Sequence, residues 1–155
     1  MRGKQAPKRL IAPDPKFQNV SVAKFINYVM NDGKKTIAQD VMYKALDLIE
    51  QKSKKNPVEV FEQAMKQVSP SLEVKSRRVG GANYQVPIPV RGERRFTLAA
   101  RWILLAARSK KGRPMYQKLA DELLAAANSE GEAFKKKEDV QRMAESNRAF
   151  AHFAR

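Results

Sequence analysis

The sequence contains no cysteine and one histidine. The lack of cysteine excludes disulfide bonds, thiolate metal sites and cysteine nucleophiles, and it fits a reducing compartment such as the cytoplasm. A catalytic triad or a histidine-based metal centre would need partners for His152 that the chain lacks. The acids fall at surface-like helical positions, without an apolar setting that would raise a pKa. We therefore expect no enzyme, no metal site and no cofactor.

A long apolar run is also missing. No stretch approaches the ~20 apolar residues that a helix needs to cross a bilayer, and residues 1–14 lack the apolar segment of a secretory signal. Binding to a membrane surface would need a basic amphipathic helix, whereas the densest charge here falls on a strand-like segment. The 155 residues, 43% of them hydrophobic, suffice for one domain with a core.

Positive charge is what the chain has in excess, and it is concentrated in two stretches. Residues 74–118 hold twelve Lys/Arg against one acid, Glu93, which gives +11. Residues 1–16 hold five Lys/Arg against Asp14, which gives +4 and completes the formal net charge of +15. A balanced body with concentrated cationic segments is typical of nucleic-acid-binding proteins, because neutralising phosphates releases counterions.

Apolar spacing predicts a mainly α-helical fold of about six helices. Three helices precede residue 70. The first begins at a Ser21 cap, the second follows Lys35, and the third begins at Asn56 and Pro57. The predicted buried stripes are Val22, Phe25, Ile26, Val29 and Met30 in the first; Ile37, Val41, Ala45, Leu48 and Ile49 in the second; and Val60, Phe61, Ala64, Met65 and Val68 in the third.

Three further helices are predicted after residue 92. They begin at about Glu93, at Pro114 and at about Ala133, and the last runs to about Phe150 with Val140, Met143, Ala144 and Asn147 on one face. Residues 1–19 contain three prolines and no apolar period, which indicates an extended basic arm. The whole chain, 1–155, is predicted to be a single domain.

Between the third and fourth helices the period changes to two, which predicts a protruding β-hairpin over residues 72–91. The strands are expected at 72–79 and 84–91, with Gly80 to Asn83 as the turn. Pro87 and Pro89 have the same parity, so both can point away from the partner strand without losing a hydrogen bond. The pattern favours a two-stranded ribbon with no third strand on that edge.

The ribbon carries cations suited to phosphates, namely Lys75, Arg77, Arg78 and Arg91. Gly80 and Gly81 allow the backbone at the tip to approach a partner closely. The sequence leaves two roles open for Tyr84, which either stacks on a base or anchors the ribbon to the body.

A second set of cations lies in and after the fourth predicted helix. Arg94, Arg101 and Arg108 are seven residues apart and share one stripe, and no acid lies between Glu93 and Asp121 to pair with them within the helix. The loop cations Lys110, Lys111 and Arg113 extend this surface. Lys34 and Lys35 at a helix start are a weaker phosphate site, because the glycine spacing of a P-loop is missing.

One run, Val74-Lys75-Ser76-Arg77-Arg78-Val79-Gly80-Gly81 followed by Tyr84-Gln85-Val86-Pro87, resembles the hairpin of the bacterial small-ribosomal-subunit protein S-seven family. The likeness extends to Asp14-Pro15-Lys16-Phe17, Gly33-Lys34-Lys35, Arg101-Trp102-Ile103, the segment Glu138 to Glu145, and Ala149 to His152. It covers nearly the whole chain in order.

The resemblance implies a primary binder of the 3′ major domain of small-subunit rRNA that organises the head of the subunit beside neighbouring ribosomal proteins. The tip residues Gly80, Gly81, Ala82, Asn83 and Tyr84 would lie near exit-site tRNA and mRNA. The implied rRNA-binding residues are Arg2, Lys4, Lys8, Arg9, Lys34, Lys35, Lys75, Arg77, Arg78, Arg91, Arg94, Arg95, Arg101, Arg108, Lys110, Lys111 and Arg113.

The charge pattern alone is also compatible with another class, an architectural DNA-binding protein whose ribbon arm wraps duplex DNA. Such arms usually come from dimers, and this sequence has no obvious dimer seam. Competition between rRNA fragments and duplex DNA would distinguish the two classes.

Overall fold

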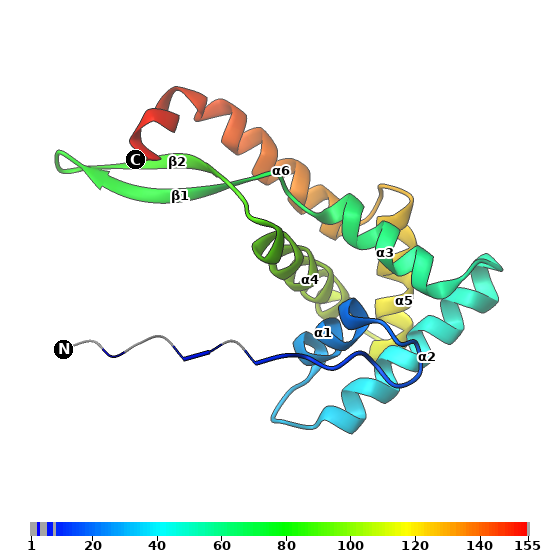
Figure 1. Ribbon diagram of the computed structural model, residues 1–155. Coiled ribbons are helices and arrows are strands. Elements are labelled where there is room, and N and C mark those ends of the chain that lie inside the picture. Colours follow the sequence, from blue (N-terminus) through cyan, green and yellow to red (C-terminus); the bar gives the residue numbers. More distant parts are fainter. Residues whose placement is uncertain (1–2, 4–5, 8, 155) are drawn as a thin grey trace.

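The computed structural model describes residues 3, 6–7 and 9–154 (Figure 1). Along the described chain, three α-helices precede a two-stranded antiparallel ribbon, and three α-helices and a 3₁₀-helix follow it. This order confirms the predicted mainly helical fold with a hairpin after the third helix. The elements are α1 (Val20–Val29), α2 (Lys35–Ser53), α3 (Pro57–Val68), β1 (Leu72–Val79), β2 (Ala82–Pro89), α4 (Gly92–Ser109), α5 (Met115–Ala127), α6 (Glu132–Ser146) and η1 (Arg148–Ala154).

The hydrophobic core is made by the helices, with α5 packed against α2, α3 and α4. Leu119 and Leu123 of α5 are fully buried. Phe25 of α1 meets Phe61 of α3 edge to face, with ring centroids 5.2 Å apart, a geometry that aromatic pairs favour. None of the helices in the described part of the chain is long and apolar enough to cross a membrane.

The N-cap residue of α3 is the predicted one, whereas the N-cap residue of α1 is not. In α3, Asn56 Oδ1 accepts a hydrogen bond of 3.0 Å from the Val58 amide and Pro57 is the first helical residue, as predicted. In α1 the cap is Asn19 rather than Ser21. Asn19 Oδ1 accepts from the amides of Ser21 and Val22 at 2.7 and 3.3 Å, so Ser21 already lies inside the helix.

The buried stripe of α2 is rotated from the predicted one. Ile37, expected in the core, is 59% exposed, and Val41 and Leu48 are only partly buried. Ala45 and Ile49 are buried as predicted, and Ala38, Met42 and Leu46 complete the buried stripe. The packing of α2 against α5 favours the stripe through Ala38, Met42 and Leu46 over the one through Ile37, Val41 and Leu48.

The extended arm is shorter than the predicted 1–19, because residues 14–19 form a docked turn. Asp14 is 2% exposed. Its Oδ2 accepts from the amides of Lys16 and Phe17 at 3.1 and 3.2 Å, and its Oδ1 accepts from the Tyr43 hydroxyl at 2.8 Å. An aspartate that bonds the backbone two residues later stabilises a turn in this way, and here it also ties the chain to α2.

The ribbon turns more tightly than predicted. Only Gly80 and Gly81 form the turn, with φ of 57° and 92°, while Ala82 and Asn83 belong to β2. Two residues with positive φ match the right-handed twist of the flanking strands. The Val90 amide donates to Ser71 O at 3.0 Å. Alternation along β2 therefore turns the nitrogens of Pro87 and Pro89 away from β1.

The sixth helix ends earlier than the predicted Phe150. The Asn147 backbone amide and the Asn147 side-chain amide both donate to Met143 O, at 3.2 and 2.8 Å. This local competition for a helical carbonyl ends α6 at Ser146. Met143, predicted to be on the inner face, is 49% exposed, whereas Ala144 is buried. The chain then returns as η1 along the ribbon (Figure 1).

Candidate nucleic-acid interface

The predicted cationic residues lie almost entirely on the surface. Arg2, Lys4 and Lys8 fall outside the described residues. Lys110 is partly buried and the others are exposed, namely Arg9, Lys34, Lys35, Lys75, Arg77, Arg78, Arg91, Arg94, Arg95, Arg101, Arg108, Lys111 and Arg113. These residues come from the arm, the α1–α2 loop, the ribbon, α4 and the α4–α5 loop.

The start of α4 joins the base of the ribbon through Glu73. Arg94 Nε lies 3.2 Å from Glu73 Oε2, and Lys75 Nζ lies 3.1 Å from Glu73 Oε1. Burial tends to raise the pKa of Glu73, but hydrogen bonds and charge from Lys75 and Arg94 together outweigh it, so the pKa lies below its ordinary value. Arg91 lines a surface hollow together with Glu73, Lys75 and Arg94.

The other end of α4 meets the loop between α1 and α2. Arg108 Nη2 donates to Asn31 Oδ1 at 3.2 Å, close in sequence to Lys34 and Lys35. Arg101 lies exposed between Arg94 and Arg108. The ribbon base, the exposed side of α4 and the α1–α2 loop therefore form one cationic band, which we call the α4 track.

The α4–α5 loop is bound to α5 by acids. Lys110 Nζ lies 2.6 Å from Glu122 Oε2, as an ion pair without the alignment of a hydrogen bond. Arg113 Nη1 lies 3.3 Å from Asp121 Oδ2. A hydrogen bond from Lys52 is the main cause that holds the pKa of Asp121 below its ordinary value, and Arg113 adds to it. Lys110 and Arg113 are thus partly neutralised within the chain.

Glu122 corrects the expectation that the acids occupy surface positions, and so does Asp14. The Glu122 side chain is fully buried, and its Oε1 accepts from the Ala133 amide at 3.0 Å. It thereby caps α6, whose own N-cap residue, Gly131, has no side chain to do so. The signal was present in the sequence, because Glu122 follows Leu119 by three residues and precedes Leu123, on the inner face of α5.

Tyr84 anchors the ribbon. Its ring centroid lies 5.1 Å from those of both Phe150 and Phe153 in η1, and Arg77 Nη1 donates to Phe153 O at 2.8 Å. His152 packs beside Phe153, with centroids 4.0 Å apart. Tyr84 therefore packs on η1 and not on the helical core, while Gly80 to Asn83 remain exposed beyond it.

A helical body, a projecting ribbon and an exposed cationic track define a nucleic-acid-binding protein. No group of acids and histidines able to hold a metal ion occurs among the described residues. A family model described as Ribosomal protein S7p/S5e matches residues 1–148. The chain therefore belongs to the ribosomal protein S7 family, which is a family of structural, RNA-binding components of the translation machinery and not an enzyme class.

Individual relatives are similar in sequence to this chain over nearly their full length. The chain is 63% identical to small ribosomal subunit protein uS7 of Thermotoga maritima, over 99% of both chains. The corresponding protein of Thermotoga neapolitana is 61% identical over 99% of both chains. That of Polynucleobacter asymbioticus is 57% identical over 98% of this chain and 97% of the relative.

Proposed function

We propose that the chain is a structural constituent of the small ribosomal subunit in the cytoplasm. In this proposal it is a primary binder of the 3′ major domain of small-subunit rRNA and organises assembly of the subunit head. Membership of the S7 family supports the proposed place in the small ribosomal subunit. The observation that carries the RNA-binding role is the α4 track, a band of exposed cations that runs from the ribbon base to the α1–α2 loop.

The proposed mechanism is electrostatic and based on shape. Arginine side chains offer planar, forked donors that match phosphate oxygens. The cations come from separate elements, so they suit phosphates of more than one RNA segment and would hold those segments in one arrangement. Double-stranded RNA is recognised mainly through shape and phosphates, which makes few sequence-reading contacts necessary.

The ribbon tip has a separate proposed role beside exit-site tRNA and mRNA. Gly80 to Asn83 are exposed and carry no charge, whereas Arg77 and Arg78 lie nearer the body. The contacts of Tyr84 and Arg77 with η1 fix the direction in which the tip projects. A small, uncharged tip suits approach to RNA ligands that must move, because it adds no strong phosphate contact.

Two experiments test the proposal. The purified chain should bind an rRNA fragment of the 3′ major domain at moderate salt, and excess duplex DNA should compete poorly. Equal competition by duplex DNA would favour an architectural DNA-binding role instead. In cells, the endogenous protein should sediment with the small ribosomal subunit, and its absence from that particle would contradict the proposal.

A further inference from the structure

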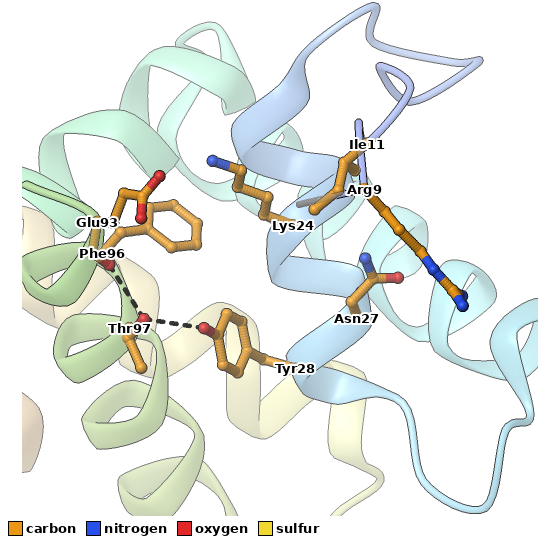
Figure 2. Close-up of a pocket in the computed structure, with 8 residues that line it drawn as sticks. All are labelled: Arg9, Ile11, Lys24, Asn27, Tyr28, Glu93, Phe96 and Thr97. Atoms are coloured by element: carbon orange, nitrogen blue, oxygen red, sulfur yellow. Dashed lines mark hydrogen bonds between the residues drawn. The ribbon is translucent and has the colours of Figure 1, made fainter. Parts of the chain in front are cut away.

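A cleft opens between the N-terminal arm, α1 and the first turns of α4. Its volume is about 450 Å³, which lies in the range of roughly 300–1,000 Å³ typical of sites for small organic groups. Figure 2 shows side chains from all three segments around the same opening. Arg9 is the one predicted RNA-binding residue among them. The other lining residues are not cations of the α4 track.

Two aromatic side chains form part of the wall, and hydrogen bonds fix one of them. The Tyr28 and Phe96 rings are partly buried, with centroids 6.3 Å apart and an interplanar angle of 46°. Thr97 Oγ1 donates to Glu93 O at 3.0 Å, so in its 2.9 Å contact with the Tyr28 hydroxyl it accepts (Figure 2). The cleft thus offers aromatic surface in a preset orientation.

The polar residues of the cleft are mixed in kind. Asn27 is exposed and provides both amide donors and a carbonyl acceptor. Arg9 and Lys24 supply positive charge, while Glu93 supplies an acid. A site for phosphate alone would have no use for the aromatic rings. Aromatic surface with an amide for hydrogen bonding suits a nucleobase, and the two cations suit its flanking phosphates.

The surroundings of the cleft indicate which molecule brings that base. Glu93 and Phe96 share the first turns of α4 with the exposed Arg94 and Arg95, so the cleft adjoins the α4 track. A partner that enters it must cover a strongly positive surface, which favours a polyanion over a peptide. Unpaired RNA bases are free to leave the stack and enter such sites, whereas bases within a duplex are not.

We propose that this cleft receives an unpaired base of the bound RNA. The inference rests on the proposed rRNA-binding function and adds a base-binding subsite to it. The base stacks on the aromatic wall, Asn27 bonds its edge, and Arg9 and Lys24 contact the adjoining phosphates. The cleft then contributes recognition of an RNA feature, an unstacked nucleotide at a set place, that the phosphate-binding track cannot supply.

Chemical probing of bound RNA tests this directly. The RNA is a fragment of the 3′ major domain, probed with dimethyl sulfate for adenine and cytosine and with a carbodiimide for guanine and uracil. The proteins are the wild-type chain, Asn27→Ala, Phe96→Leu and the matched control Gln51→Ala, which removes an exposed amide from α2 away from the cleft. Asn27→Ala changes an exposed helical residue and should fold normally.

The expected result is one unpaired base that wild-type protein and Gln51→Ala protect and that Asn27→Ala leaves reactive. The RNA affinity should fall about fivefold for Asn27→Ala and about tenfold for Phe96→Leu, with the salt slope unchanged. If Asn27→Ala preserves every protection and the full affinity, the cleft holds no base and the inference is wrong, although RNA binding stands. Failure of the wild-type chain to bind the fragment is a different result, which removes the proposed function as well.

Discussion

Arg94 at the start of α4 and Glu73 at the base of the ribbon form an ion pair, with Nε and Oε2 3.2 Å apart. The Glu73 side chain is 12% exposed, whereas Arg94 is 45% exposed. The carboxylate therefore lies beneath its partner, and the guanidinium keeps an open side. One arginine in this way connects two elements of the fold and still presents charge outward.

The Glu73 contacts predict a pH dependence of stability. Lys75 and Arg94 overcome the effect of burial and lower the pKa of Glu73 in the folded chain. A lowered pKa gives stability that is complete above the ordinary glutamate value and is lost as the pH falls through the folded value. Glu73→Gln should remove this acid-sensitive part, about 1 kcal/mol or less because both partners are half exposed. Urea unfolding at several acidic pH values, where wild type and variant should converge, measures it.

Adjacent lysines of the α4–α5 loop should behave differently. Lys110→Ala leaves the buried Glu122 carboxylate without its counter-ion, which should cost about 1–3 kcal/mol of unfolding free energy. Lys111→Ala removes an exposed cation and should weaken RNA binding with little loss of stability. Thermal unfolding and RNA titration of both variants give the comparison. Equal stability of the two variants would show that Lys110 does not compensate Glu122.

Removal of the Tyr84 ring should loosen the ribbon without unfolding the body. A lone two-stranded hairpin is marginal in water, and here the ring packs on Phe150 and Phe153. Tyr84→Ala should accelerate hydrogen exchange of the β2 amides about tenfold, because each aromatic pair contributes about 0.5–1.5 kcal/mol. Arg78→Ala, an exposed change on β1, is the control. Unchanged exchange in Tyr84→Ala would mean that η1 does not hold the ribbon.

The docked turn at Asp14 predicts an alkaline transition. Burial and the hydrogen bond to Asp14 raise the pKa of Tyr43 to about 12. A raised pKa means that the folded chain keeps the proton longer than the unfolded chain, so stability falls as the pH rises from the ordinary tyrosine value toward about 12. Tyr43→Phe should lose about 1–2 kcal/mol at neutral pH and lack this alkaline slope. Tyrosinate absorbance and urea unfolding against pH measure both effects, and an identical slope in the variant would contradict the assignment.

Local signals in the sequence predicted most of the helical framework. Asn56 and Pro57 define the start of α3 through backbone chemistry that needs no tertiary contact. The double proline in β2 likewise indicates a ribbon that takes no third strand on the outer edge of β2. Local rules fail where neighbours decide, as in α2, where packing against α5 selects the stripe with Ala38 over the stripe with Ile37.

Among the site residues, too, local signals predict some features and tertiary contacts decide others. Exposure of the arginines on α4 follows from helical period and charge, so Arg94, Arg101 and Arg108 were accessible to prediction. Their partners were not, because Glu73 lies 21 residues from Arg94 in the sequence and meets it only in the folded chain. A count of charge along the chain treats Lys110 and Arg101 alike. The fold separates them, because it pairs Lys110 with a buried acid and leaves Arg101 exposed.

The salt dependence of RNA affinity in a charge-reduced α4 track tests the central claim most directly. The test variant carries Arg94→Ala, Arg101→Ala and Arg108→Ala. The control carries Lys55→Ala, Lys66→Ala and Lys135→Ala, three exposed cations outside the predicted surface. Each lost phosphate contact should reduce the slope of log affinity against log salt by about one. We expect the test variant to lose about two to three units of slope while it stays folded and the control keeps the wild-type slope. Equal slopes for all three proteins would show that α4 does not bind the RNA.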